Sequence, residues 1–325
     1  MNRLLAGIDI GGTKIAIALA NTAGELVAER FIETQAELGP YAILENTCQT
    51  LAEMCSECKG RLVAIGVGSP APIDVNRGLI MSPSNLQDWI QFPIVDLLVE
   101  RFAVPVMLDN DANAAALGEY MYGAGRGYQN VFYITFSTGI GGGIVINGEI
   151  YHGICTSAGE IGHMIVQPDG VRCNCGSVGC LESISAGISI ARRAKERLAN
   201  GESSLMTGMV SSIDEVTAKT VVDAVRQNDP LATEIWDETC RYLAIGIGNA
   251  VTLLAPEIVI IGGGVAKAGE LLFERLHRLV PHFVSMVPSE KINISPAQLG
   301  AVSGVRGALA IAQKAFSNSH VTHAV

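Results

Sequence analysis

Three cysteines and one histidine in the sequence are spaced as the ligands of a metal ion. His163 is followed by Cys173, Cys175 and Cys180 in a His-x9-Cys-x-Cys-x4-Cys pattern. Three thiolates and one imidazole complete the tetrahedral coordination that Zn²⁺ prefers, and a closed site with four protein ligands is normally structural. The pattern therefore predicts a structural zinc site. The alternative is a set of three buried thiols beside a core histidine.

Carboxylate and amide side chains are concentrated in the segment Asp109-Asn110-Asp111-Ala112-Asn113, which follows a short apolar run. An Asp or Asn is an ordinary N-cap at the start of a helix, so one of these residues needs no further role. Four such residues in five exceed what capping requires. A carboxylate at the end of a strand can take a proton from a substrate hydroxyl, and a neighbouring Asn can orient the same substrate. The segment is therefore a candidate catalytic site.

Two further carboxylates accompany the metal pattern. Glu160 lies three residues before His163, and Glu182 lies two residues after Cys180. A zinc site flanked by two carboxylates would fix hydrogen-bond acceptors for a polyol, because the metal ligands hold the chain on which both carboxylates stand. The alternative is that both are ordinary surface carboxylates.

A glycine-rich turn near the N-terminus has the composition of a phosphate site. In Asp9-Ile10-Gly11-Gly12-Thr13-Lys14, the paired glycines let the backbone approach an oxyanion closely. Thr13 adds a hydroxyl donor, and Lys14 could add a positive charge. Asp9, at the end of a strand, is placed to hold Mg²⁺ directly or through water. The alternative is a plain hairpin turn.

A second glycine-rich turn, Ser137-Thr138-Gly139-Ile140-Gly141-Gly142-Gly143, occupies the matching position in the second half of the chain. A protein that clamps a polyphosphate between two lobes would need two such turns, one in each half of the chain. Gly262-Gly263-Gly264 could line the base or ribose of a nucleotide, or could be a bare turn between a strand and a helix. No Walker A loop occurs, and the dinucleotide fingerprint is not convincingly present.

The elements that must position these motifs repeat about half a chain apart, as strand, glycine-rich turn, strand and Asn/Gly turn. Such a long period suggests duplicated domains rather than a solenoid. We expect a small lobe over residues 1–122, with a C-terminal helix at about 301–316 packing back on it, and a large lobe over 123–300. The expected strands and helices are strands 4–10, 15–20, 25–32, 61–68, 104–108, 131–136, 144–146 and 257–261 and helices 40–59 and 112–121.

Composition limits the class of protein. The chain has 325 residues, of which 49% are hydrophobic and 36 are Gly, as in α/β proteins with many tight turns. A net charge of −10 argues against a nucleic-acid surface. The sequence has no apolar run long enough to span a bilayer and no secretory signal, so we expect a cytoplasmic protein that binds no membrane. In that compartment the eight cysteines suggest metal binding, redox use or burial rather than disulfides.

The sequence resembles the ROK family of bacterial-type sugar kinases and related repressors over nearly the whole chain. The glycine turns alone are not specific, whereas the last two motifs together are highly specific. The resemblance is carried by Asp9-Ile10-Gly11-Gly12-Thr13-Lys14, Asp109-Asn110-Asp111-Ala112-Asn113, Thr138-Gly139-Ile140-Gly141-Gly142-Gly143, Gly159-Glu160-Ile161-Gly162-His163 and Cys173-Asn174-Cys175-Gly176-Ser177-Val178-Gly179-Cys180-Leu181-Glu182.

This resemblance implies an α/β fold of the two-lobed actin-like, ribonuclease-H type, with the active site in the interdomain cleft. It implies that Asp111 is the general base, taking a proton from a sugar hydroxyl that attacks the γ-phosphate of ATP. It places around the sugar the residues Asn85, Asn110, Asp111, Glu160, His163 and Glu182, with His163 also on the zinc. It assigns ATP and Mg²⁺ to Asp9, Gly11, Gly12, Thr13, Lys14, Thr138, Gly139, Gly263 and Gly264.

Glucose is the leading substrate because the remaining pattern is similar to the family's glucokinases, while N-acetylmannosamine, N-acetylglucosamine and fructose remain open. Ala71 stands where the family often has Gly, and its methyl group could narrow the sugar pocket. A sugar-responsive repressor is disfavoured, because the first strand begins at residue 4 and leaves no room for a helix-turn-helix domain. We expect a homodimer.

Overall fold

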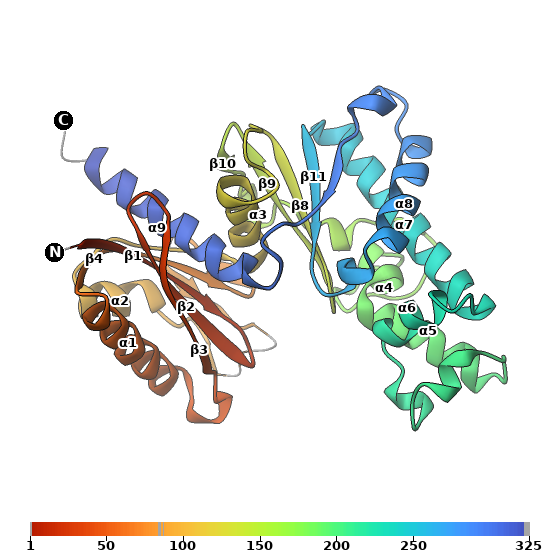
Figure 1. The fold of residues 1–325 in the computed structure, drawn as a ribbon, viewed down its shortest axis with the longest axis horizontal. Helices are drawn as coiled ribbons and strands as arrows, with labels where there is room; N and C mark the ends of the chain where they lie inside the picture. The colour runs from red at the N-terminus through yellow and green to blue at the C-terminus, as the bar shows by residue number, and fades with distance from the viewer. Residues whose placement is uncertain (1, 84–85, 87, 322–325) are drawn as a thin grey trace. The chain divides into compact units, whose positions relative to one another are not determined.

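The computed structural model (Figure 1) describes residues 2–83, 86 and 88–321. The chain divides into two compact units. The first unit contains Met1–Gly127, Gly143–Ala158 and Leu299–Val325, and the second contains Tyr128–Gly142 and Gly159–Gln298. Each unit is described separately below.

The first unit is built on a five-stranded sheet with the order β3-β2-β1-β4-β7. β1, β2 and β3 are antiparallel neighbours, whereas β4 and β7 run parallel to β1. The strands of this unit are β1 (Asn2–Ile10), β2 (Lys14–Asn21), β3 (Leu26–Glu33), β4 (Gly60–Ser69), the short pair β5 (Ile73–Asp74) and β6 (Leu79–Ile80), and β7 (Val106–Asn110). Its helices are α1 (Pro40–Glu57), α2 (Ile94–Phe102), α3 (Asp111–Tyr122) and α9 (Ser303–Val321).

The two faces of this sheet bury different kinds of side chain. Because side chains alternate along a strand, Leu4, Ala6 and Ile8 of β1 join one core with α1 and α2, and Leu5 joins a second core with α9. The face toward α9 is lined by small residues, such as Ala18 of β2, which let the helix approach closely. Figure 1 shows α9, in blue, lying along the sheet although it is last in the sequence.

The backbone of α9 lies very close to β4 at Gly66. A Cβ added there would lie 2.1 Å from the carbonyl oxygen of Ala308 and 2.4 Å from the backbone nitrogen of Ala312 in α9. Because backbone atoms must shift to relieve the clash, Gly66→Ala is expected to cost about 1–3 kcal/mol of stability. Thermal unfolding measures this as a fall in Tm. The matched control is Gly208→Ala, because an added Cβ there has nothing within 4 Å. Equal Tm values for the two variants would contradict the close packing.

The second sheet has the order β10-β9-β8-β11-β12, and the division between the units falls within β9. β8, β11 and β12 are parallel. Its strands are β8 (Val131–Phe136), β9 (Ile140–Ile146), β10 (Glu149–Ile150), β11 (Ile258–Gly262) and β12 (Ile294–Pro296). The helices of the second unit are α4 (Leu181–Ser185), α5 (Gly187–Ala199), α6 (Ala218–Val225), α7 (Pro230–Leu254) and α8 (Glu270–Leu279). The 3₁₀ helices of the chain are η1 (Ala36–Leu38), η2 (Ile154–Thr156), η3 (Ile161–His163), η4 (Leu205–Gly208), η5 (Ile213–Glu215), η6 (Val265–Ala268), η7 (Val280–Phe283), η8 (Ser289–Lys291) and η9 (Gly300–Val302).

Two expectations from the sequence differ from the structure in one region. Gly141, Gly142 and Gly143 were expected in a turn but belong to β9, so the turn itself is confined to residues 137–139. Residues 143–158 were expected in the second lobe but cluster with the first unit. The second difference has a physical reason: a Cβ on Gly143 would lie 2.7 Å from the Cβ of Ala116, so the bare backbone of β9 packs against α3 of the first unit.

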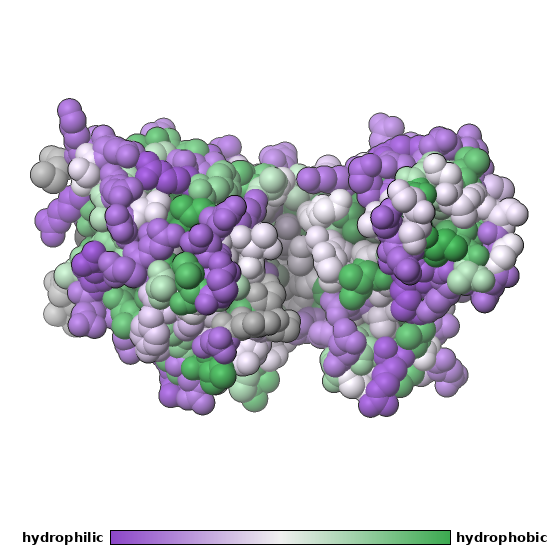
Figure 2. Space-filling model, turned by 90° about the horizontal axis from the view of Figure 1, so that it is seen from below, coloured by the Kyte–Doolittle hydropathy of each residue, from purple (hydrophilic) through white to green (hydrophobic). Residues whose placement is uncertain are grey.

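No helix among the described residues is both long and apolar enough to cross a membrane. On the face of the molecule drawn in Figure 2, hydrophobic side chains are interspersed with hydrophilic ones.

Candidate active site and metal centre

The candidate base stands at a tightly held junction in the first unit. β7 ends at Asn110 and α3 begins at Asp111. The Oδ1 atom of Asn110 caps the helix by accepting a hydrogen bond from the Asn113 N–H at 2.6 Å. The buried Oδ1 of Asp109 accepts from the Asn110 N–H at 2.8 Å and from the Asn113 amide at 2.9 Å. Asp109 and Asn110 therefore hold the turn, and Asp111 is the exposed carboxylate that it presents.

Asp9 is the second carboxylate of this region. Burial, and then the negative charge of Asp111, raise the pKa of Asp9 to about 6, and Lys14 partly opposes them. A Cβ added to Gly304, in the first turn of α9, would lie 2.1 Å from Asp9 Oδ2. The carboxylate therefore lies against the N-terminal turn of a helix. Asp9 and Asp111 offer carboxylate oxygens, the kind of ligand that Mg²⁺ prefers.

The first glycine turn is a closed hairpin between β1 and β2. The Gly11 N–H donates to the carbonyl of Lys14 at 3.0 Å, and the Thr34 hydroxyl donates to the carbonyl of Gly11 at 2.7 Å. Gly12 and the exposed Thr13 form the tip. The ammonium of Lys14 lies 5.1 Å from the centre of the Phe31 ring on β3. This side chain thus has an aromatic partner in the structure.

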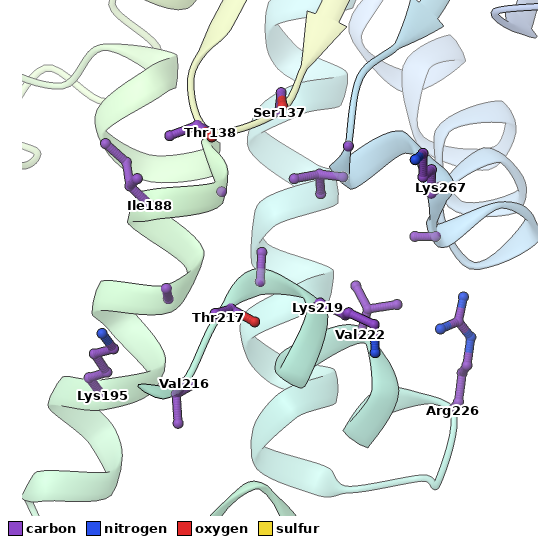
Figure 3. A pocket seen from close by; sticks show the side chains of 16 residues that line it. Ser137, Thr138, Ile188, Lys195, Val216, Thr217, Lys219, Val222, Arg226 and Lys267 are labelled. Atoms are coloured by element: carbon purple, nitrogen blue, oxygen red, sulfur yellow. The ribbon is translucent and has the colours of Figure 1, made fainter. Parts of the chain in front are cut away.

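The second glycine turn borders a cavity of about 560 Å³ in the second unit (Figure 3). Thr138 and Gly264 line it, together with apolar side chains such as Ile188 of α5, Val222 of α6, and Val216, which precedes α6. Gly263 is not among the residues that line it, and a Cβ there would lie 2.4 Å from the carbonyl oxygen of Phe136, so packing requires a glycine at this position.

Four basic side chains that belong to none of the sequence motifs line this cavity: Lys195, Lys219, Arg226 and Lys267. Lys219 and Arg226 both pair with Asp223, at 2.6 and 2.8 Å. The side chain of Lys267, in η6, has no hydrogen bond or ion pair within the described part of the chain. No local spacing could reveal this group, because α5, α6 and η6 contribute its members from distant parts of the sequence.

The four metal-pattern residues come together in the second unit, with their ligating atoms within 4.8 Å of one another. His163 Nδ1 lies 3.7 Å from the Sγ atom of Cys173, and the Sγ atoms of Cys175 and Cys180 also lie 3.7 Å apart. Zinc–sulfur bonds of about 2.3 Å in a tetrahedron place two sulfur atoms about 3.8 Å apart, so this cluster has the spacing of a zinc site.

The thiols of the cluster differ in acidity. A hydrogen bond from the Ser177 backbone lowers the pKa of Cys175 to about 6, whereas burial raises the pKa of Cys180 to about 12. A divalent cation would favour the thiolate form of all three cysteines. The donor set and its spacing therefore fit Zn²⁺.

Glu182 and Glu160 stand beside this cluster. Glu182, which follows Cys180 into α4, accepts a hydrogen bond from the Ile140 N–H at 2.9 Å. A Cβ on Gly139 would lie only 2.6 Å from Glu182 Oε2. Glu160 Oε2 lies 4.0 Å from His163 Nε2, the ring nitrogen that faces away from Cys173. The second unit thus unites the cluster, both carboxylates and the second glycine turn.

Of the remaining predicted site residues, Asn85 lies outside the described residues. In the first unit, Asp9 and Asp111 influence each other electrostatically. His152 of the first unit, absent from the sequence-based site, has its Nε2 atom 2.7 Å from Asp109 Oδ2.

Comparison with known proteins identifies the family. The sequence pattern of the ROK family matches residues 5–315. A glucokinase of Halalkalibacterium halodurans is 39% identical, over 94% of this chain and 94% of that protein. The ROK hexokinase of Thermus thermophilus has 32% identity and a TM-score of 0.85, covering 97% of this chain and 99% of its own. A ROK glucokinase of Streptomyces griseus, solved with glucose and AMPPNP, has 33% identity and a TM-score of 0.78, covering 96% and 99%.

These similarities extend over nearly the full length of each chain. They confirm the predicted α/β fold of the actin-like ATPase type. The chain belongs to the ROK family.

Proposed function

We propose that this protein transfers the γ-phosphoryl group of ATP to a hydroxyl of a hexose, with glucose as the leading substrate. The observation that carries the proposal is the cavity of about 560 Å³ beside the second glycine turn, whose size and lining suit a nucleotide. The glucokinase and hexokinase relatives support the same activity.

Different parts of the cavity suit different parts of ATP. Its apolar walls suit the purine ring. The turn with Thr138 and Gly139, and the separate turn with Gly264 after β11, would offer backbone N–H groups and a hydroxyl to phosphate oxygens. Lys267 adds an ammonium group that the protein does not otherwise engage in the described residues. In the first unit, the hairpin with Gly11, Gly12, Thr13 and Lys14 is proposed as a second phosphate contact.

Asp111 is the proposed general base. The sugar hydroxyl oxygen attacks the γ-phosphorus as Asp111 takes its proton, the bond from the γ-phosphorus to the β–γ bridging oxygen breaks, and ADP leaves. Positioning and charge stabilisation supply most of the rate in such transfers. The proposed sugar contacts are Asn85, Asn110, Glu160, His163 and Glu182.

Two metal ions complete the proposal. Asp9 would hold Mg²⁺, which neutralises phosphate charge when bound. Zn²⁺ would be held by His163, Cys173, Cys175 and Cys180 as a structural ion, since four protein ligands leave no open coordination position. We further propose a cytoplasmic homodimer that binds no nucleic acid, in keeping with the net charge of −10.

A coupled assay of ADP formation over a panel of hexoses and N-acetylhexosamines tests the activity. Glucose should give the highest kcat/KM. A higher kcat/KM for N-acetylmannosamine, N-acetylglucosamine or fructose would support the proposed kinase activity but replace glucose as its substrate. Ala71 would then be the first position to examine. If none of the sugars in the panel supports ADP formation, the proposal is overturned.

Filling the cavity tests the nucleotide site. Ala191 of α5 lines the cavity, so the indole of Ala191→Trp would occupy space proposed for ATP. We expect KM for ATP to rise at least about tenfold, the effect of losing roughly 1.4 kcal/mol of binding, with KM for sugar nearly unchanged. The control is Ala199→Trp at the exposed end of the same helix. A selective rise in the sugar KM would show that the cavity is not the nucleotide site.

A further inference from the structure

His152 connects the candidate catalytic turn to a distant part of the first unit. It follows β10 in sequence, and its Nε2 atom lies 2.7 Å from Oδ2 of Asp109, 43 residues earlier. The Asp109 side chain is 9% exposed and that of His152 is 36% exposed. A carboxylate so deeply buried depends on its hydrogen-bond donors, because unpaired charge in the interior is unfavourable.

The three donors to Asp109 have different origins. The two at Oδ1 are the Asn110 N–H and the Asn113 amide, which belong to the same turn as Asp109. His152 approaches the other carboxylate oxygen from a separate segment. The hydrogen bond and the charge of Asp109 raise the pKa of His152 against the opposing effect of burial. These observations describe a side-chain hydrogen bond that joins two segments of the first unit.

The segment that carries His152 is itself constrained. The carbonyl of His152 accepts a hydrogen bond from the Ala158 N–H at 3.0 Å, which closes the loop between them. Cys155 and Thr156 in this loop have φ values of 52° and 58°, in the left-handed region that residues other than glycine seldom adopt. The hydrogen bond from Ala158 therefore ties the backbone of His152 to the end of this loop.

We propose that His152 is a positioning residue for the candidate base: by holding Oδ2 of Asp109, it fixes the turn from which Asn110 and Asp111 are presented. Asp109 is bonded to the N–H of Asn110, and Asn110 caps the helix that begins at Asp111. A shift of Asp109 therefore moves the base. This inference rests on the proposed kinase function.

A pair of conservative variants tests the contact itself. The amide nitrogen of Gln can reach the place of the imidazole Nε2, whereas that of the shorter Asn reaches only the place of Nδ1. His152→Gln should keep kcat within about threefold of the wild type, while His152→Asn and His152→Ala should lower kcat about 10–100-fold, as expected for a base displaced by up to about 1 Å. KM for ATP should stay within about twofold in all three.

A positioning role predicts that Gln preserves kcat and that kcat falls without a change in KM for ATP. A general loss of stability predicts neither result. The control is His282→Ala, an exposed histidine of η7. Equal kcat for the Gln and Asn variants would overturn the inference, and so would kcat values that follow Tm rather than the reach of the side chain. If the wild type phosphorylates no sugar, the proposed function fails; if it is active and all three His152 variants match it, only this inference fails.

Discussion

Asp111→Asn is expected to lower kcat by about 10²–10⁴-fold while the affinity for sugar stays within about tenfold, because the amide keeps the shape of the side chain and cannot accept the proton. The structure explains why folding should be spared. Asp111 is exposed, and the helix cap is supplied by Asn110. Steady-state kinetics together with equilibrium sugar binding measure both quantities.

The matched control for this substitution is Asp96→Asn. Asp96 is an exposed carboxylate in the first turn of α2, in the same unit, so the substitution makes the same change of charge near a helix N-terminus. Its kcat should equal that of the wild type. A near-normal kcat for Asp111→Asn would remove Asp111 from the role of base.

Cys175→Ser is expected to abolish stoichiometric zinc, lower Tm and weaken sugar binding together. Loss of one thiolate breaks the four-ligand set and frees the chain between Cys173 and Cys180, which leads directly into Glu182. His163 would lose the ion that orients its ring. Affinity for ATP should change much less. Metal analysis should give one zinc per chain for the wild type and well under one for the variant.

Cys58→Ser is the control for this change, because Cys58 lies at the end of α1 in the first unit, whereas the cluster residues belong to the second unit. It should retain the zinc and the wild-type sugar affinity. Full sugar phosphorylation by protein verified to be free of zinc would show that the cluster is dispensable and would break the proposed link between the metal and the sugar site.

The parts of the site that could be predicted from sequence are those formed by short segments. The metal ligands span only residues 163–180, and their spacing alone predicted a cluster whose ligating atoms the structure brings within 4.8 Å. The helix that starts at Asp111 was likewise signalled by the Asp and Asn residues before it. Local hydrogen-bonding rules govern both features, so they are visible without the rest of the fold.

The features that could not be predicted depend on contacts between distant segments. Glycine composition suggested a turn through Gly143, but residues 141–143 pair into the second sheet as part of β9, and the bare backbone of Gly143 packs on α3. The basic lining of the cavity is assembled from three elements, and the His152–Asp109 contact spans 43 residues. No periodicity or motif encodes such neighbours, because they follow from the tertiary fold.

The packing of α9 on the first sheet has a consequence for biosynthesis. The sheet is complete in sequence at Asn110, but the helix that covers its small-residue face begins at Ser303. A ribosome that adds about 5–20 residues per second needs on the order of 10–40 s to synthesise the intervening chain. During that interval the nascent N-terminal segment carries an uncovered apolar face around Leu5, Ala18 and Ala64. The first unit can therefore finish folding only after α9 has been translated, and until then that face is available to chaperones.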